Sequence, residues 1–137
     1  MSWTKSLIKL STYQVEELQK RLAEIADRRR AIEMQLVGLA AEAVSESQAA
    51  EGDAEAGWFK AGWLEGLRVR KSALQEQLRQ VTAEELGARD VLAEAFEEQK
   101  KYELVAENMR LVQVRETARR ETAALDELGL RAAARGR

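Results

Sequence analysis

The sequence contains no cysteine, no histidine and no proline among its 137 residues. The first two absences exclude disulfides, the usual zinc and haem sites, Cys or His nucleophiles and a Ser-His-Asp triad. Average usage would place about seven prolines in a chain of this length. Since proline breaks helices, its absence leaves long uninterrupted helices possible. We therefore expect no enzyme activity, no metal and no cofactor.

The chain also has no large excess of charge of either sign, because 22 basic and 24 acidic residues leave a net charge of −2. The run Arg28, Arg29, Arg30 is flanked by acids and favours a solvated helix face over a nucleic-acid site. No apolar run approaches the roughly 20 residues of a membrane span. The expected partner is protein rather than nucleic acid or lipid, with no integral membrane segment, and the expected location is cytoplasmic.

What the sequence does contain is helix-forming residues in a heptad pattern. Ala, Glu, Leu, Arg and Lys make up 82 of the 137 residues. Nine of eleven positions are apolar in a strict heptad that begins at Ile8, and a heptad keeps one seam facing a partner helix. The positions are Ile8, Ser11, Val15, Leu18, Leu22, Ile25, Arg29, Ile32, Leu36, Leu39 and Ala43.

The pattern predicts one all-α domain over 1–137, an antiparallel two-helix coiled-coil hairpin with unequal helices. We expect a first helix over about 3–47, an acidic turn over about 48–57, a second helix over about 58–128 that stops at Gly129, and a short basic tail over 129–137. A turn centred near Asp53 would pair residue i with about 107 minus i, setting Leu22 near Glu85, Leu36 near Lys71 and Ile8 near Gln99. The second helix would then overhang from about Lys100.

The seam of the second helix is longer and less regular. Besides Ser11, the two seams contain four polar members, and a polar seam residue commonly sets register; these are Arg29, Lys71, Glu85 and Gln99. Arg29 either reaches a carboxylate such as Glu76 or extends to water. Glu84 and Glu85, like Glu97 and Glu98, are expected on the helix surface. The whole second seam is Leu64, Leu67, Lys71, Leu74, Leu78, Val81, Glu85, Ala88, Leu92, Ala95, Gln99 and Tyr102, followed after a one-residue shift by Val105, Met109 and Val112.

Two clusters are candidate protein-binding sites. Trp58, Phe59 and Trp63 fall within six residues and form either a plug that closes the hairpin or an exposed contact patch. The overhang carries an apolar band wider than a two-stranded seam needs. That band either self-associates or packs on residues 1–8, or it docks against another protein. Its candidate contact residues are Tyr102, Val105, Met109 and Val112.

Several blocks together resemble the flagellar FliJ family over nearly the whole chain: SLIKLSTYQVEELQKRLAEI, RRRAIEMQLVGLAAE, EEQKKYELVAENM and RRETAALDELG. The resemblance implies an antiparallel hairpin similar to the coiled coil of the rotary ATPase gamma subunit. It also implies a non-catalytic stalk and escort of the flagellar type III export apparatus. Such a protein promotes assembly and activity of the hexameric export ATPase FliI, links it to the export gate protein FlhA and handles export chaperones.

The resemblance also suggests where partners bind. Gln35, Leu39 and Phe59 match gate-contacting positions near the hairpin tip, whereas Glu42 and Glu46 replace the family's tyrosines. Trp58 and Trp63 could supply replacement aromatic surface. For the ATPase ring the resemblance implies the end that carries both termini, including the overhang. The alternative is a generic scaffolding coiled coil, or the stalk of a related non-flagellar type III secretion system.

Overall fold

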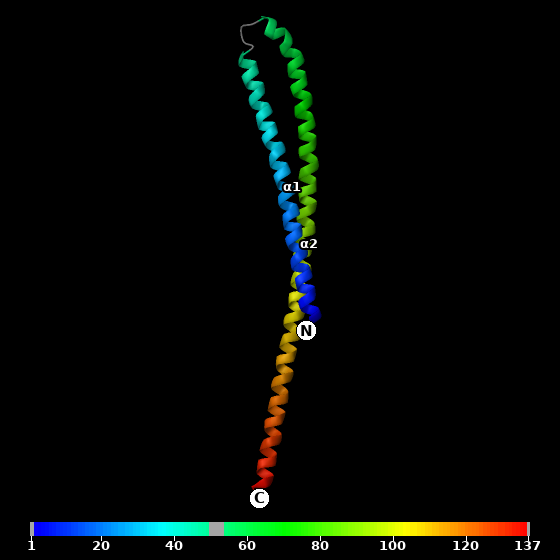
Figure 1. Cartoon of the computed structure of the whole chain (residues 1–137), viewed down its shortest axis with the longest axis vertical. Helices are drawn as coiled ribbons and strands as arrows, with labels where there is room; N and C mark the ends of the chain where they lie inside the picture. Colours follow the sequence, from blue (N-terminus) through cyan, green and yellow to red (C-terminus); the bar gives the residue numbers. More distant parts are fainter. Residues whose placement is uncertain (1, 50–53, 137) are drawn as a thin grey trace. The chain divides into compact units, whose positions relative to one another are not determined.

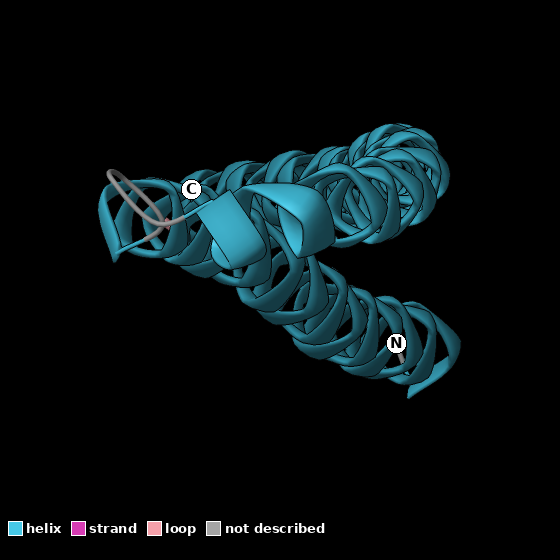
Figure 2. Ribbon diagram, turned by 90° about the horizontal axis from the view of Figure 1, so that it is seen from above, coloured by secondary structure: helices cyan, strands magenta, loops and turns pink. Residues whose placement is uncertain are grey.

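The computed structural model describes residues 2–49 and 54–136, with side chains over 3–49 and 59–136. It contains two helices, α1 (Ser2–Ala49) and α2 (Ala54–Arg135) (Figure 1). Every described residue except Gly136 is helical, and no strand occurs in these ranges (Figure 2). The expected all-α class, with one helix longer than the other, is confirmed.

The helix bounds differ from the expected ones mainly at the end of α2. α1 agrees within two residues at each end, and α2 begins at Ala54 instead of residue 58. The expected turn over 48–57 is therefore shorter, and its centre, 50–53, lies outside the described residues. The expected stop at Gly129 and the tail over 129–137 are wrong, because α2 continues to Arg135. A single glycine lowers the stability of a helix by only about 1 kcal/mol relative to alanine, and the three alanines at 132–134 favour helix.

The chain forms two compact units, Val15–Glu94 and a second made of Met1–Gln14 with Ala95–Arg137. In the first unit the two helices run antiparallel, since Arg28 binds Glu84 at 2.7 Å and Arg70 binds Glu42 at 3.4 Å. The buried apolar side chains of this unit come from both helices. They are Val15, Ile25, Leu67 and Val81.

The register differs from the one expected from the turn. The residue numbers of the three cross-helix ion pairs add up to 112 for Arg28–Glu84 and Glu42–Arg70 and to 114 for Arg29–Glu85, rather than to 107. Glu85 consequently lies opposite Arg29 instead of Leu22, and in the other unit Gln99 meets Thr12 instead of Ile8. Apolar seams repeat every seven residues, so they tolerate neighbouring registers, and the polar side chains select among them.

The seam of α1 is confirmed, because all eleven of its heptad positions are buried or half-buried. On α2 the strict heptad continues through Ala106 and Met109, so the expected one-residue shift to Val105 and Val112 is wrong. Leu64 and Lys71 are exposed as well. Near the turn, α2 therefore contributes less to the seam than its heptad suggests.

The unit that contains both chain ends has a paired part and an unpaired part. Thr4 and Ser11 of α1 are buried, and α2 stays half-buried at intervals as far as Met109. Beyond Met109, every described side chain is exposed except that of Glu116, which is half-buried. α2 thus overhangs from about residue 110, ten residues later than expected.

Candidate protein-binding surfaces

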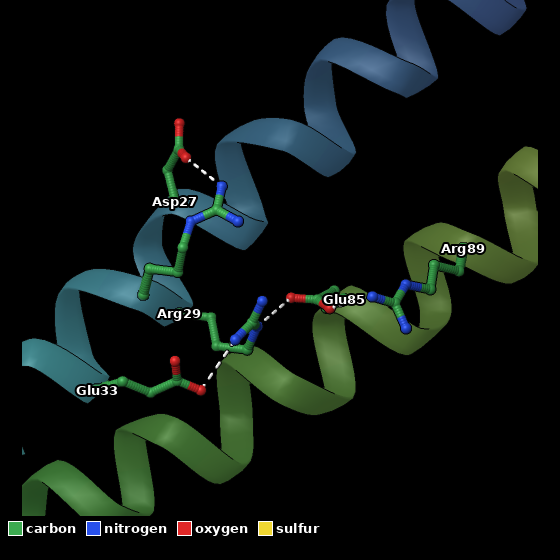
Figure 3. A network of polar contacts seen from close by, with 6 residues as sticks. Asp27, Arg29, Glu33, Glu85 and Arg89 are labelled. Atoms are coloured by element: carbon green, nitrogen blue, oxygen red, sulfur yellow. Dashed lines mark hydrogen bonds and ion pairs between the residues drawn. The ribbon is translucent and has the colours of Figure 1, made fainter.

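A charged layer between α1 and α2 sets the geometry of the Val15–Glu94 unit. Glu85 is 5% exposed and accepts hydrogen bonds from Arg29 Nε and Arg89 Nη2, both at 2.7 Å. Arg29 Nη1 also donates to Glu33 at 2.9 Å, so the guanidinium bridges a carboxylate on each helix (Figure 3). The chain therefore places one buried acid between two arginines.

Electrostatics hold this layer in its charged form. The hydrogen bond from Arg29 lowers the pKa of Glu85 below its ordinary value, and the charges of Arg29, Arg89 and Arg30 act in the same direction against the opposing effect of burial. The hydrogen bonds to Glu85 and Glu33 raise the pKa of Arg29. Breaking the layer would leave a buried carboxylate without its partner.

Two expectations about this layer need correction. Arg29 does reach a carboxylate across the helices, but that of Glu85 rather than that of Glu76, which binds Arg79 on its own helix. Glu85 is not on the surface, because the true register brings Arg29 to it across the seam. The sequence did contain a signal for this contact, since both residues are polar and occupy seam positions.

A second polar layer lies in the unit that contains the chain ends. Gln99 Nε2 donates to Thr12 Oγ1 at 3.0 Å, while the hydroxyls of Ser11 and Thr12 both donate to the carbonyl oxygen of Ile8. No described buried side-chain nitrogen or oxygen lacks a hydrogen-bond partner. The polar seam residues therefore lower stability little, because their hydrogen bonds are made, and they favour one register of α1 against α2.

The expected tip residues do not form one patch. The ion pair between Arg70 and Glu42 fixes how the two helices line up near the turn. Phe59 lies about 16 Å from this ion pair along α2, in the direction of the turn. Leu39 lies about 4 Å from it along α1, in the direction away from the turn. Gln35 is one turn farther still. Phe59 is 68% exposed, Trp63 is half-buried, and the side chain of Trp58 lies outside the described residues.

Leu39 remains accessible through a groove between the helices. The groove has a volume of about 530 Å³, and leucines and alanines from both helices dominate its lining. Gln35 does not line the groove and is exposed on α1. The apolar lining consists of Leu36, Leu39, Ala40, Ala43, Leu64 and Leu67.

The expected overhang residues share one face of α2 but differ in burial. Tyr102 and Met109 are half-buried toward α1, and Tyr102 donates its hydroxyl to Glu98 at 3.3 Å. The charge of Glu98, burial and this hydrogen bond raise the pKa of Tyr102. Val105 is 42% exposed and Val112 is 62% exposed. Two of the four are thus open to a partner as the chain stands.

A flagellar FliJ protein of Caulobacter vibrioides is 48% identical to this chain over 134 residues, which cover 98% of this chain and 96% of the relative. The chain belongs to the flagellar FliJ family. The FliJ protein of a second strain of the same species matches equally well. No family model and no solved structure matches the chain.

Three surfaces of this FliJ family member are candidate protein-binding sites. Among the described residues, no group of three or more Asp or Glu side chains is placed to hold a metal ion. Neither helix, over its described length, is apolar enough to cross a membrane. The candidate sites are the tip, the inter-helix groove and the overhang of α2.

Proposed function

We propose that this chain is a non-catalytic component of the flagellar protein export apparatus. It acts as a stalk and escort that promotes assembly and activity of the ring of the export ATPase FliI, links the ring to the gate protein FlhA and handles export chaperones. Family membership supports the flagellar context. The observation that carries the proposal is the overhang, where α2 continues about 25 residues past its last pairing with α1.

The overhang and the paired turns just before it suit a ring partner, because they present apolar side chains that the hairpin leaves uncovered. Val105 and Val112 are exposed on the face that also carries Tyr102 and Met109. A helix inside a sixfold ring cannot contact six identical subunits identically. Unequal contacts favour different nucleotide states in different subunits, which couples stalk binding to hydrolysis.

The gate contact is assigned to the turn end of the Val15–Glu94 unit. Exposed Phe59, half-buried Trp63 and the groove beside Leu39 offer apolar surface there. Trp58 and Gln35 remain part of the proposed surface. Large aromatic residues are common binding anchors, so we expect Phe59→Ala to weaken FlhA binding more than Gln35→Ala.

The proposal is tested by the ATP hydrolysis rate of the matching FliI with and without this protein. The full chain should raise the rate, and a chain truncated after Met109 should fail to do so while keeping every described pairing of α1 with α2. Val105→Ala with Val112→Ala should reduce the stimulation. Val69→Ala is the matched control, because Val69 is a 54% exposed valine elsewhere on α2.

Full stimulation by the truncated chain would overturn the role of the overhang. If the full chain neither stimulated nor bound FliI, the stalk proposal would fail and the alternative of a scaffolding coiled coil would take its place. Circular dichroism of each variant establishes that a loss of stimulation is not a loss of helix.

A further inference from the structure

A second apolar stripe begins in the paired part of α2 at Leu104 and continues along the overhang. Counting alternately three and four residues from Leu104 gives the positions 104, 107, 111, 114, 118, 121, 125, 128 and 132, of which seven are apolar. The large members are all exposed, between 37% and 68%. We call this the distal stripe; its large residues are Leu104, Leu111, Val114, Leu125 and Leu128.

The distal stripe lies on the face of α2 that points away from α1. Leu104 is two residues from both Tyr102 and Ala106, which belong to the seam with α1. Two residues correspond to about 200° around a helix, so the stripe and the seam lie on opposite faces. α1 cannot cover the stripe, and the face of Val105 and Val112 is also separate from it.

The residues that border the stripe indicate the chemistry of its partner. In a coiled coil these bordering positions meet their counterparts on the other helix. Here they carry three arginines and one acid, all exposed. Arg110 pairs with Glu107 and Arg131 pairs with Glu127, whereas Arg115 forms no ion pair with any side chain in the described ranges. The bordering charges are Glu103, Arg110, Arg115 and Arg131.

A second copy of this chain packed in parallel is a poor occupant, because Arg110 of one copy would meet Arg115 of the other. An amphipathic helix of another protein with acidic edges complements them. We infer that the distal stripe of α2 binds such a helix, an apolar heptad seam bordered by Asp or Glu, through Leu104–Leu128 with Arg110 and Arg115 pairing to its acids. This goes beyond the ATPase contact, because it uses the opposite face of α2.

The probe is a labelled synthetic peptide of four heptads with leucine at the two seam positions and glutamate at the bordering positions. Its like charges oppose self-pairing, so its fluorescence anisotropy reports binding to the full chain. The comparison peptide has lysine in place of each bordering glutamate. We expect the acidic peptide to bind, and the basic peptide to bind at least about tenfold more weakly.

The stripe is identified by matched variants of the full chain. Leu111→Ala and Leu125→Ala should each weaken the acidic peptide about tenfold, the loss expected from one uncovered leucine. Leu130→Ala is the control, because Leu130 is 72% exposed on another face of the same helix and should change nothing. Arg115→Glu should weaken the acidic peptide and strengthen the basic one.

Several results would overturn the inference. These are no binding of the acidic peptide, equal binding of the two peptides, or an equal loss in Leu130→Ala. If the full chain were a dimer and the Leu125→Ala variant a monomer, the stripe would bind a second copy instead. The double variant Val105→Ala, Val112→Ala should still bind the peptide, so failure of the ATPase proposal and failure of this one are distinguishable.

Discussion

Glu85 is a buried carboxylate at the interface between α1 and α2. It is buried, and it accepts hydrogen bonds from Arg29 of the other helix and Arg89 of its own. A buried ion pair adds little net stability over an apolar pair, but removing one partner is costly because the other charge is left buried. This layer therefore specifies register more than it strengthens the hairpin.

Stability should fall in acid because of Glu85. Its pKa is lower in the folded chain than the ordinary value of 4.5, so its contribution is present above about pH 4.5 and is lost as pH falls through the folded pKa. Glu85→Gln should flatten this part of the pH dependence of urea unfolding. Glu65→Gln is the control, because the pKa of Glu65 is also lowered, but by Arg68 in an exposed pair on one helix. Equal flattening by the two variants would contradict the assignment.

Ile25 tests the apolar part of the seam. It is 1% exposed, the most buried side chain of the described residues. We expect Ile25→Ala to lower the free energy of unfolding by about 2 kcal/mol, near the low end for a buried isoleucine, because a two-helix seam surrounds it less than a globular core would. Leu86→Ala, at a 56% exposed leucine, should change it little. Urea denaturation measures both.

At the scale of the helix, α2 is continuous through every glycine that could have ended it. An added Cβ would meet nothing within 4 Å at Gly129, and no positive φ is found there. We expect Gly129→Ala to stabilise this end of α2 by about 1 kcal/mol, seen as slower amide hydrogen exchange over residues 125–135. Faster exchange would show that the glycine is needed where it is.

The helices themselves could be predicted from the sequence, and their register could not. The eleven heptad positions of α1 were predicted and all lie at the seam, because burial of a periodic apolar face forms any such helix. Register depends on which polar side chains meet. Arg29 with Glu85 and Thr12 with Gln99 are visible only once the two helices are paired.

At the scale of the whole molecule, the pairing can be tested by cross-linking, which the absence of cysteine makes clean. Arg28→Cys with Glu84→Cys should react with a short bis-maleimide to give a cross-linked monomer, since these positions form an ion pair across the helices. Arg28→Cys with Gln77→Cys, one heptad nearer the turn, should react more slowly. A cross-linked dimer on a denaturing gel would instead show helices paired between two chains.

The candidate sites differ in how far the sequence alone points to them. Trp63, Phe59 and Val112 stand out as aromatic or apolar residues, and Phe59 and Val112 are exposed. Gln35 and Leu39 are tip candidates by resemblance alone, and the register sets them well away from Phe59. The leucines of the distal stripe lie among charges, so the stripe is visible only in a heptad counted from Leu104.

The all-α class, the unequal helices and the seam of α1 follow from the sequence alone, because heptad periodicity and composition act locally along each helix. The family follows from sequence identity with a relative. The register, the burial of Glu85 and the point at which α2 leaves α1 are visible only in the folded chain. These depend on which residues meet across two helices whose apolar seams are compatible with more than one pairing. Polar groups that must find partners when buried make that choice.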